Sequence, residues 1–152
     1  MTFNDFFDRK FRVSKTCKEN LDSILKDEDF KRNFGLNLAN LTMLCICIGV
    51  KNNQPMRADA QNNAEIPWGP LSDDNKALYQ VLLWDIVQKK LPEFYSLEID
   101  KDNDEDLKKG MKELQEYCEY GADYLYNKKI ALQKLLTHED FINMFIEDDF
   151  YE

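Results

Sequence analysis

Side chains suited to nucleophilic catalysis are few in this chain of 152 residues. A serine or cysteine nucleophile needs a nearby base, and His138 is the single histidine in the sequence. It stands at the expected start of a helix, where a capping or solvent-facing position suits it. The sequence holds no glycine-rich phosphate loop and no G-x-S-x-G motif. We therefore predict no catalytic site and no cofactor, and expect that the protein is not an enzyme.

The best metal candidate is a run of alternating aspartates, Asp100, Asp102, Asp104 and Asp106. The run opens like a calcium-binding loop, which needs Gly at its sixth position and Glu at its twelfth. This chain has Glu105 and Met111 at those positions. Acidic residues in the first turn of a helix are stabilised by the helix dipole, so we expect the run to begin a helix and hold no metal.

The four cysteines also fail to form a metal site by their spacing. Cys45 and Cys47 lie two residues apart on an expected helix, where they point about 200° from each other and cannot share an ion. Cys17 and Cys118 stand isolated in the sequence. We expect all four to be structural, and reduced in the cytoplasm.

The beginning of the chain predicts a strand followed by a helix. Residues 10–14 alternate between polar and apolar side chains, which places Phe11 and Val13 on one face of a short strand. Lys10, Arg12 and Ser14 would then lie on the other face. Ser14 or Thr16 can cap the helix that follows, and the acidic residues at 27–29 end it.

A second, very apolar helix is expected after a turn over residues 26–34. Asn37 can cap this helix, which runs to a stop near Gly49. It is apolar on nearly every side, so it must be enclosed by the rest of the fold or shared with a second copy of the chain. The sequence leaves both alternatives open.

The order strand, helix, turn and apolar helix resembles that of ribbon-helix-helix proteins. In those dimers, two strands pair into a ribbon that enters the major groove, and the second helix begins near a phosphate. The candidate DNA contacts by this resemblance are Lys10, Arg12, Ser14, Lys15, Asn37 and Asn40. The same elements also fit a unit that only builds the core.

The remainder of the chain predicts a connector and further helices. Residues 51–70 are predicted to form an extended connector or a small hairpin. A helix is expected to begin at Ser72 and to end before Pro92, and a long helix is expected to begin near Asp102. Gly121 would be a close-packing site or kink. Thr137, with Asp140 three residues later, resembles a capping box and begins a last short helix. The long helix has an expected inner face of Leu107, Met111, Leu114, Cys118, Leu125 and Leu132.

These patterns together predict a mainly α fold, with a short N-terminal strand followed by a compact bundle of about five helices. We expect one domain over residues 1–152, since a chain of this length can bury a core of its own. Within it, residues 1–50 form the strand-helix-helix element, 51–70 the connector and 71–152 the acidic helical part.

Charge is distributed unevenly along the chain, whose net charge is −9. Residues 1–60 carry ten basic and eight acidic side chains, whereas residues 61–152 carry ten and twenty-one. Phosphate backbones would be repelled by the second segment, so nucleic-acid contact is expected in the first third. Alternatively, the acidic segment could imitate the phosphates of DNA and occupy the nucleic-acid channel of a nuclease or repressor. Its partner-binding residues would be Asp102, Asp104, Glu105 and Asp106.

The chain shows no membrane anchor in its sequence. The longest apolar run, residues 41–50, is too short to span a bilayer. The first residues, MTFNDFFDRKF, lack a basic region leading into an apolar stretch and so do not resemble a signal peptide. We expect a cytoplasmic protein.

Four segments resemble the small Dnd system-associated proteins, which accompany bacterial DNA phosphorothioation genes. They are FRVSKTCKENL at 11–21, FGLNLANLTMLCICIGVKNNQP at 34–55, IPW at 66–68 and EYCEYGADYL at 116–125. The resemblance spans most of the chain as an ordered pattern, but Tyr120, Gly121 and Ala122 only approximate the family's small residues after a tyrosine. It implies defence against foreign DNA and carries no catalytic residues.

Three functional hypotheses follow. The first is a non-enzymatic accessory protein of a phosphorothioation-linked or related anti-phage system, which binds other subunits, and also DNA through its basic strand. It predicts a homodimer or a stable complex. The second is the acidic imitator of DNA, and the third is a ribbon-helix-helix repressor that reads a specific operator.

Overall fold

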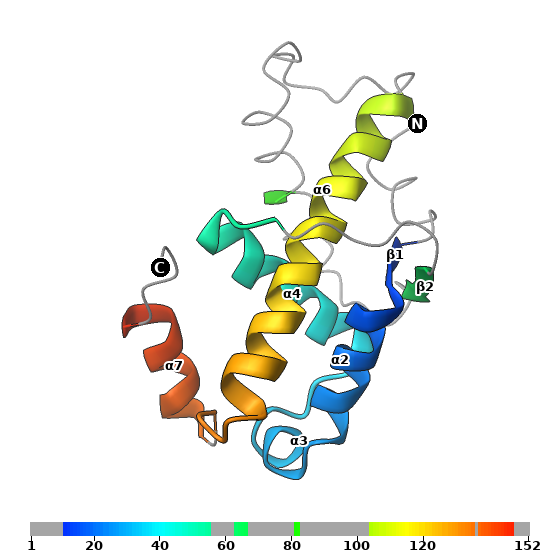
Figure 1. Cartoon of the computed structure of the whole chain (residues 1–152). Coiled ribbons are helices and arrows are strands. Elements are labelled where there is room, and N and C mark those ends of the chain that lie inside the picture. The colour runs from blue at the N-terminus through cyan, green and yellow to red at the C-terminus, as the bar shows by residue number, and fades with distance from the viewer. Residues whose placement is uncertain (1–10, 56–62, 67–80, 83–103, 136, 148–152) are drawn as a thin grey trace.

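The computed structural model describes residues 11–55, 63–66, 81–82, 104–135 and 137–147, with 63, 104–107 and 145–147 described by their backbone alone. Helices account for 77% of these residues, and a pair of short strands completes the fold. The predicted mainly α architecture with an N-terminal strand is therefore confirmed (Figure 1). The helix expected between Ser72 and Pro92 lies almost entirely outside the described residues.

The N-terminal strand β1 spans Phe11–Ser14 and pairs with a second strand of the same chain. This strand, β2 (Asn63–Ile66), runs antiparallel to β1, with Phe11 opposite Ile66 and Arg12 opposite Glu65. The expected connector thus contains a strand. The first residues of β1 alternate as predicted, because Phe11 and Val13 are buried while Arg12 is exposed.

Ser14 caps the next helix, α2 (Lys15–Lys26), by accepting a hydrogen bond from the Cys17 N–H at 3.0 Å. The turn expected over 26–34 is in fact a short helix, α3 (Glu28–Phe34). Asp27 ends α2 and caps α3, accepting from the Phe30 N–H at 2.9 Å. The prediction of a turn was wrong because seven residues are too few to display a helical period.

The apolar helix α4 spans Leu38–Asn52 and is capped by Asn37, as predicted. It continues three residues beyond Gly49, the expected stop, and ends at Asn53, whose backbone is left-handed. Its buried residues are Ala39, Leu41, Thr42, Met43, Cys45, Ile46, Ile48, Gly49 and Asn52. The chain itself therefore encloses most of this helix, which favours the core interpretation over a shared interface.

The long helix α6 (Asp104–Asp123) continues into a π-helical segment, η1 (Tyr124–Ile130). Figure 1 shows α4 crossing behind the yellow rod of α6. The two backbones touch: a Cβ at Gly121 would lie 1.9 Å from the Cys45 carbonyl oxygen, and one at Gly49 would lie 2.2 Å from that of Tyr117. The prediction that Gly121 is a close-packing site is confirmed.

The last helix, α7 (His138–Glu147), begins with the expected capping box. The Asp140 N–H donates to Thr137 Oγ1 at 3.1 Å, and the Thr137 N–H donates to Asp140 Oδ2 at 3.0 Å. The His138 ring stacks on Phe34 of α3 with 4.9 Å between ring centroids, and Phe141 packs on the same ring. The histidine thus joins two helices besides starting one.

Buried apolar side chains of β1, α2, α4, α6 and η1 form one core. Leu114, Cys118 and Leu125 lie in it as predicted, but Leu132 is 58% exposed because it follows η1 in a turn. Among the described helices, none alone is long and apolar enough to cross a membrane. The helices α3 and α4 meet that test only when taken together, and they are bent by 93° relative to each other.

Candidate nucleic-acid interface

The junction between β1 and α2 presents two exposed cations, Arg12 and Lys15. Arg12 is the outward residue of the strand, and Lys15 begins the helix directly after the capping serine. Both residues were predicted as DNA contacts, and their places at the surface are compatible with that prediction. Lys10, the third predicted cation, lies outside the described residues.

Ser14 was expected on the outer face of the strand, and this expectation was wrong. Ser14 is only 5% exposed, and both its backbone N–H and its hydroxyl donate hydrogen bonds to Glu119 of α6. The Ser14 N–H donates to Glu119 Oε1 at 2.6 Å, and the hydroxyl donates to Oε2 at 2.7 Å. A buried carboxylate requires such donors, which is why the serine turns inward. Ser14 therefore supports the junction from inside.

Glu119 is 2% exposed and lies at the N-terminal end of α2, which has no acidic residue in its own first turn. A helix N-terminus stabilises a negative charge, so α6 supplies the acid that α2 lacks. We call the contact between Glu119 and Ser14 the junction lock. This contact was not predicted, because the two residues are 105 positions apart and nothing local to Glu119 indicates a partner.

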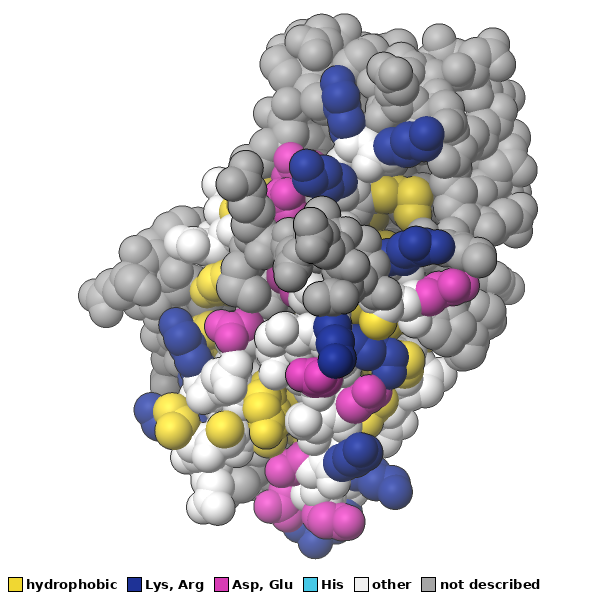
Figure 2. All heavy atoms as spheres, turned by 45° about the vertical axis from the view of Figure 1, so that its right-hand side comes forward, with side chains coloured by type: hydrophobic (Ala, Val, Ile, Leu, Met, Phe, Trp, Pro, Cys, Tyr) yellow, Lys and Arg dark blue, Asp and Glu magenta, His cyan; other side chains and the backbone are white. Residues whose placement is uncertain are grey.

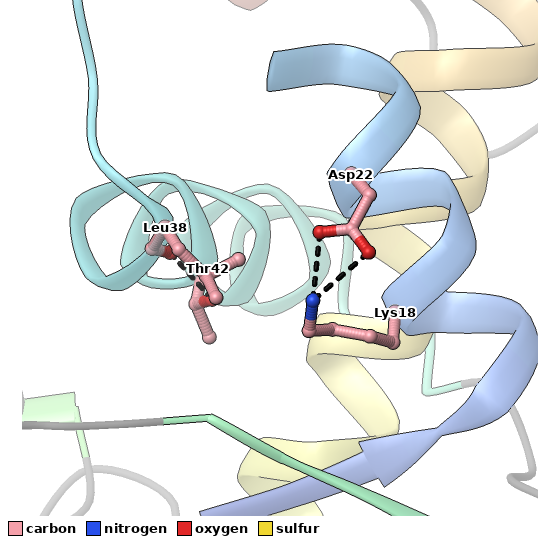
Figure 3. A network of polar contacts seen from close by, with 4 residues as sticks. All are labelled: Lys18, Asp22, Leu38 and Thr42. Carbon is pink, nitrogen blue, oxygen red and sulfur yellow. Dashed lines mark hydrogen bonds and ion pairs between the residues drawn. The ribbon is translucent and has the colours of Figure 1, made fainter. Parts of the chain in front are cut away.

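Other cations on the first helices are paired within their own helix. The Lys18 ammonium binds both carboxylate oxygens of Asp22, at 2.7 and 2.9 Å, on the side of α2 next to the start of α4 (Figure 3). Arg32 forms an ion pair with Asp29 in α3. These two cations are therefore less suited to hold a phosphate than Arg12 and Lys15.

Asn37 and Asn40, the predicted phosphate contacts, lie together at the start of α4. The Asn37 side chain is exposed, and its Oδ1 accepts the Asn40 N–H at 2.8 Å. This hydrogen bond is an ordinary helix cap, which accounts for Asn37 without a ligand. A role for these residues on DNA stays a prediction.

The acidic residues of the alternative hypothesis begin α6. Asp104, Glu105 and Asp106 form the first turn of the helix, and Asp102 lies outside the described residues. Because anionic side chains stabilise a helix N-terminus, their position has a structural explanation.

Cys17 and Cys118 were expected to be isolated, and this expectation was wrong because the two residues meet in the fold. The Sγ atoms of Cys17 and Cys118 are 4.0 Å apart, and the Cys118 thiol also lies 4.0 Å from the Thr42 carbonyl oxygen. The contact with Cys118 and burial raise the pKa of Cys17 far above its ordinary value. Burial likewise raises the pKa of Cys45 and brings that of Cys47 to about 11. Within the described part of the chain, no cluster of three or more ligand-type side chains forms a metal site.

The π-helical segment η1, at the C-terminal end of the long rod, carries a pair of lysines. The Lys128 and Lys129 ammonium groups lie 5.9 and 5.7 Å from the centroid of the Tyr124 ring. In an α-helix, residues 124 and 129 would not share a face, but the wider turn of a π-helix brings both lysines over one ring. The aromatic ring thus holds both cations through cation–π contacts.

No family model, curated protein or solved structure matches the chain. The candidate interface therefore depends on its own geometry, and its most specific feature is the junction lock beneath Arg12 and Lys15.

Proposed function

We propose that this chain is a non-enzymatic accessory protein of a DNA phosphorothioation-linked or related anti-phage defence system. It works in the cytoplasm, binds larger subunits of that system, and contacts DNA through the basic junction of β1 and α2. The resemblance to Dnd-associated proteins supplies the context. One observation carries the DNA contact: Arg12 and Lys15 are exposed at a junction held by two short hydrogen bonds to Glu119.

A fixed junction favours binding because a preorganised surface loses less conformational freedom when it meets its ligand. The cations bind phosphate, which gives affinity without sequence specificity. The contact does not use a ribbon shared by two copies, because β1 pairs with β2 and its Ser14 N–H is bonded to Glu119. The pairing of β1 within its own chain thus favours the accessory protein over the repressor.

The test is fluorescence anisotropy of labelled duplex DNA, plain and phosphorothioated, at low and near-physiological salt. We expect binding that weakens as salt rises and a loss of affinity in the Arg12→Glu/Lys15→Glu variant. A preference for the modified duplex would tie the protein to phosphorothioation.

The matched control is Lys26→Glu/Lys134→Glu, which changes the charge equally at exposed positions away from the junction. We expect this control to bind nearly as well as the unchanged protein. Absence of binding at low salt, or equal losses in both variants, would contradict the DNA contact and leave binding to a protein partner to be measured.

A further inference from the structure

The fold brings lysines of the acidic segment to the same side of the molecule as the basic strand. The helix α6 packs against β1, and the junction lock fixes which side of α6 faces the strand. Successive residues of an α-helix are about 100° apart. Lys112 and Lys108, seven and eleven residues before Glu119, therefore lie within about 20° of the direction of Glu119.

Both lysines are exposed, although Glu119 below them is buried. Figure 2 shows several Lys and Arg side chains on the upper part of the described surface, at the height where α6 begins and β1 lies, besides others lower down. Among the side chains that the structure describes, acidic ones are fewer in this upper part than basic ones. Glu116 is about 60° from the line of lysines, and Glu65 faces Arg12 across the strands.

We propose that the phosphate-binding surface continues from Arg12 and Lys15 onto α6 through Lys108 and Lys112, and that its ligand is the backbone of duplex DNA. This inference rests on the proposed function, which it extends to a second element. Cations on two packed elements can bind phosphates that are spaced along a duplex. The junction of β1 and α2 alone reaches only a short stretch of the DNA backbone. The sequence did not indicate this surface, because Lys108 and Lys112 belong to a segment whose net charge is strongly negative.

The test is the salt dependence of duplex binding by the Lys108→Gln/Lys112→Gln variant. Each phosphate contact contributes about −0.9 to the slope of log K against log salt, so losing two contacts should reduce the magnitude of this negative slope by about 1.8. The matched control is Lys128→Gln/Lys129→Gln, which removes two charges at the other end of the same rod. We expect the control to keep the slope of the unchanged protein.

Circular dichroism of both variants checks that they fold. An unchanged slope in Lys108→Gln/Lys112→Gln, or an equal decrease in the control, would overturn this inference. If Arg12→Glu/Lys15→Glu weakens binding while Lys108→Gln/Lys112→Gln does not, only the extension onto α6 fails. If the unchanged protein binds no DNA at low salt, the proposed DNA contact fails with it.

Discussion

The buried carboxylate of Glu119 is the residue on which the N-terminal junction depends most. It accepts the backbone and hydroxyl hydrogens of Ser14, and that hydroxyl in turn accepts the Cys17 N–H. Glu119, Ser14 and the Cys17 N–H, which come from two distant parts of the chain, thus meet one another's need for hydrogen-bond partners. Removing one member leaves the others buried without a partner, which costs more than the net value of the bond.

Glu119→Ala should lower the free energy of unfolding by about 3 kcal/mol, because it leaves two buried donors of Ser14 unsatisfied. Urea unfolding measures this change. Glu116→Ala is the control on the same helix, and a half-buried residue of this kind should change stability by about 0.5 kcal/mol or less. Equal effects of the two substitutions would refute the importance of the junction lock.

The thiols predict how stability depends on alkaline pH. Burial raises the pKa of Cys47 from 9.0 to about 11 in the folded protein. Below pH 9 both states hold the proton, but between pH 9 and 11 the unfolded state loses it while the folded state keeps it. The free energy of unfolding should therefore fall as pH rises through this window.

Unfolding at pH 8 and pH 10.5, under reducing conditions, should show a smaller alkaline loss of stability in Cys47→Ser than in the unchanged protein. The comparison between the two proteins removes the contributions of lysine and tyrosine titration. Identical losses would mean that the Cys47 thiol titrates alike in both states.

At the scale of elements, the crossing of α4 and α6 depends on two glycines. Gly121 lies against the Cys45 carbonyl and Gly49 against that of Tyr117, so the helices approach by backbone contact. The same glycines follow Tyr117 and Cys45 by four residues, which means that each helix offers one carbonyl and one glycine to the other. Any side chain at either glycine would force the helices apart.

Gly121→Ala should lower the free energy of unfolding by about 3 kcal/mol, since overpacking of this kind moves the backbone. Gly35→Ala is a useful comparison, because Gly35 has a positive φ of 57° but open space around the added Cβ. Its cost should be about 1 kcal/mol from backbone strain alone. Thermal or urea unfolding of both variants measures the difference, and a smaller effect at Gly121 than at Gly35 would contradict the close crossing.

Local patterns in the sequence were enough to predict where three of the helices begin. Ser14, Asn37 and Thr137 each cap a helix as expected, because a cap bonds to a backbone group only a few residues away. The short helix α3 was not predicted, because its seven residues are too few to show a helical period of apolar side chains. The pairing of β1 with β2 was also missed, since strand pairing joins residues that are far apart in the chain and no local pattern specifies the partner.

The candidate interface was predicted only in part, for the same reason. The exposure of Arg12 followed from alternation along the strand, whereas the inward turn of Ser14 required knowledge of Glu119. Likewise, Cys17 and Cys118 stand far apart in sequence and meet only through the packing of α2 against α6. Side-chain periodicity reports which face is buried but not what lies opposite it.

At the scale of the whole molecule, charge along the sequence does not translate into charge on separate faces. The segment from 61 to 152 carries the excess of acidic residues, yet its exposed Lys108 and Lys112 lie on the side of α6 that faces β1. A basic surface can therefore exist on a protein with a net charge of −9.

NMR can locate the DNA contact directly, by following the backbone amide shifts of the labelled protein as a short duplex is added. We expect the largest changes to cluster at residues 12–15 and along the first half of α6, and residues 128–134 at the far end to stay unchanged. Changes confined to the η1 end, or no changes at low salt, would contradict a DNA-binding surface built on β1 and α6.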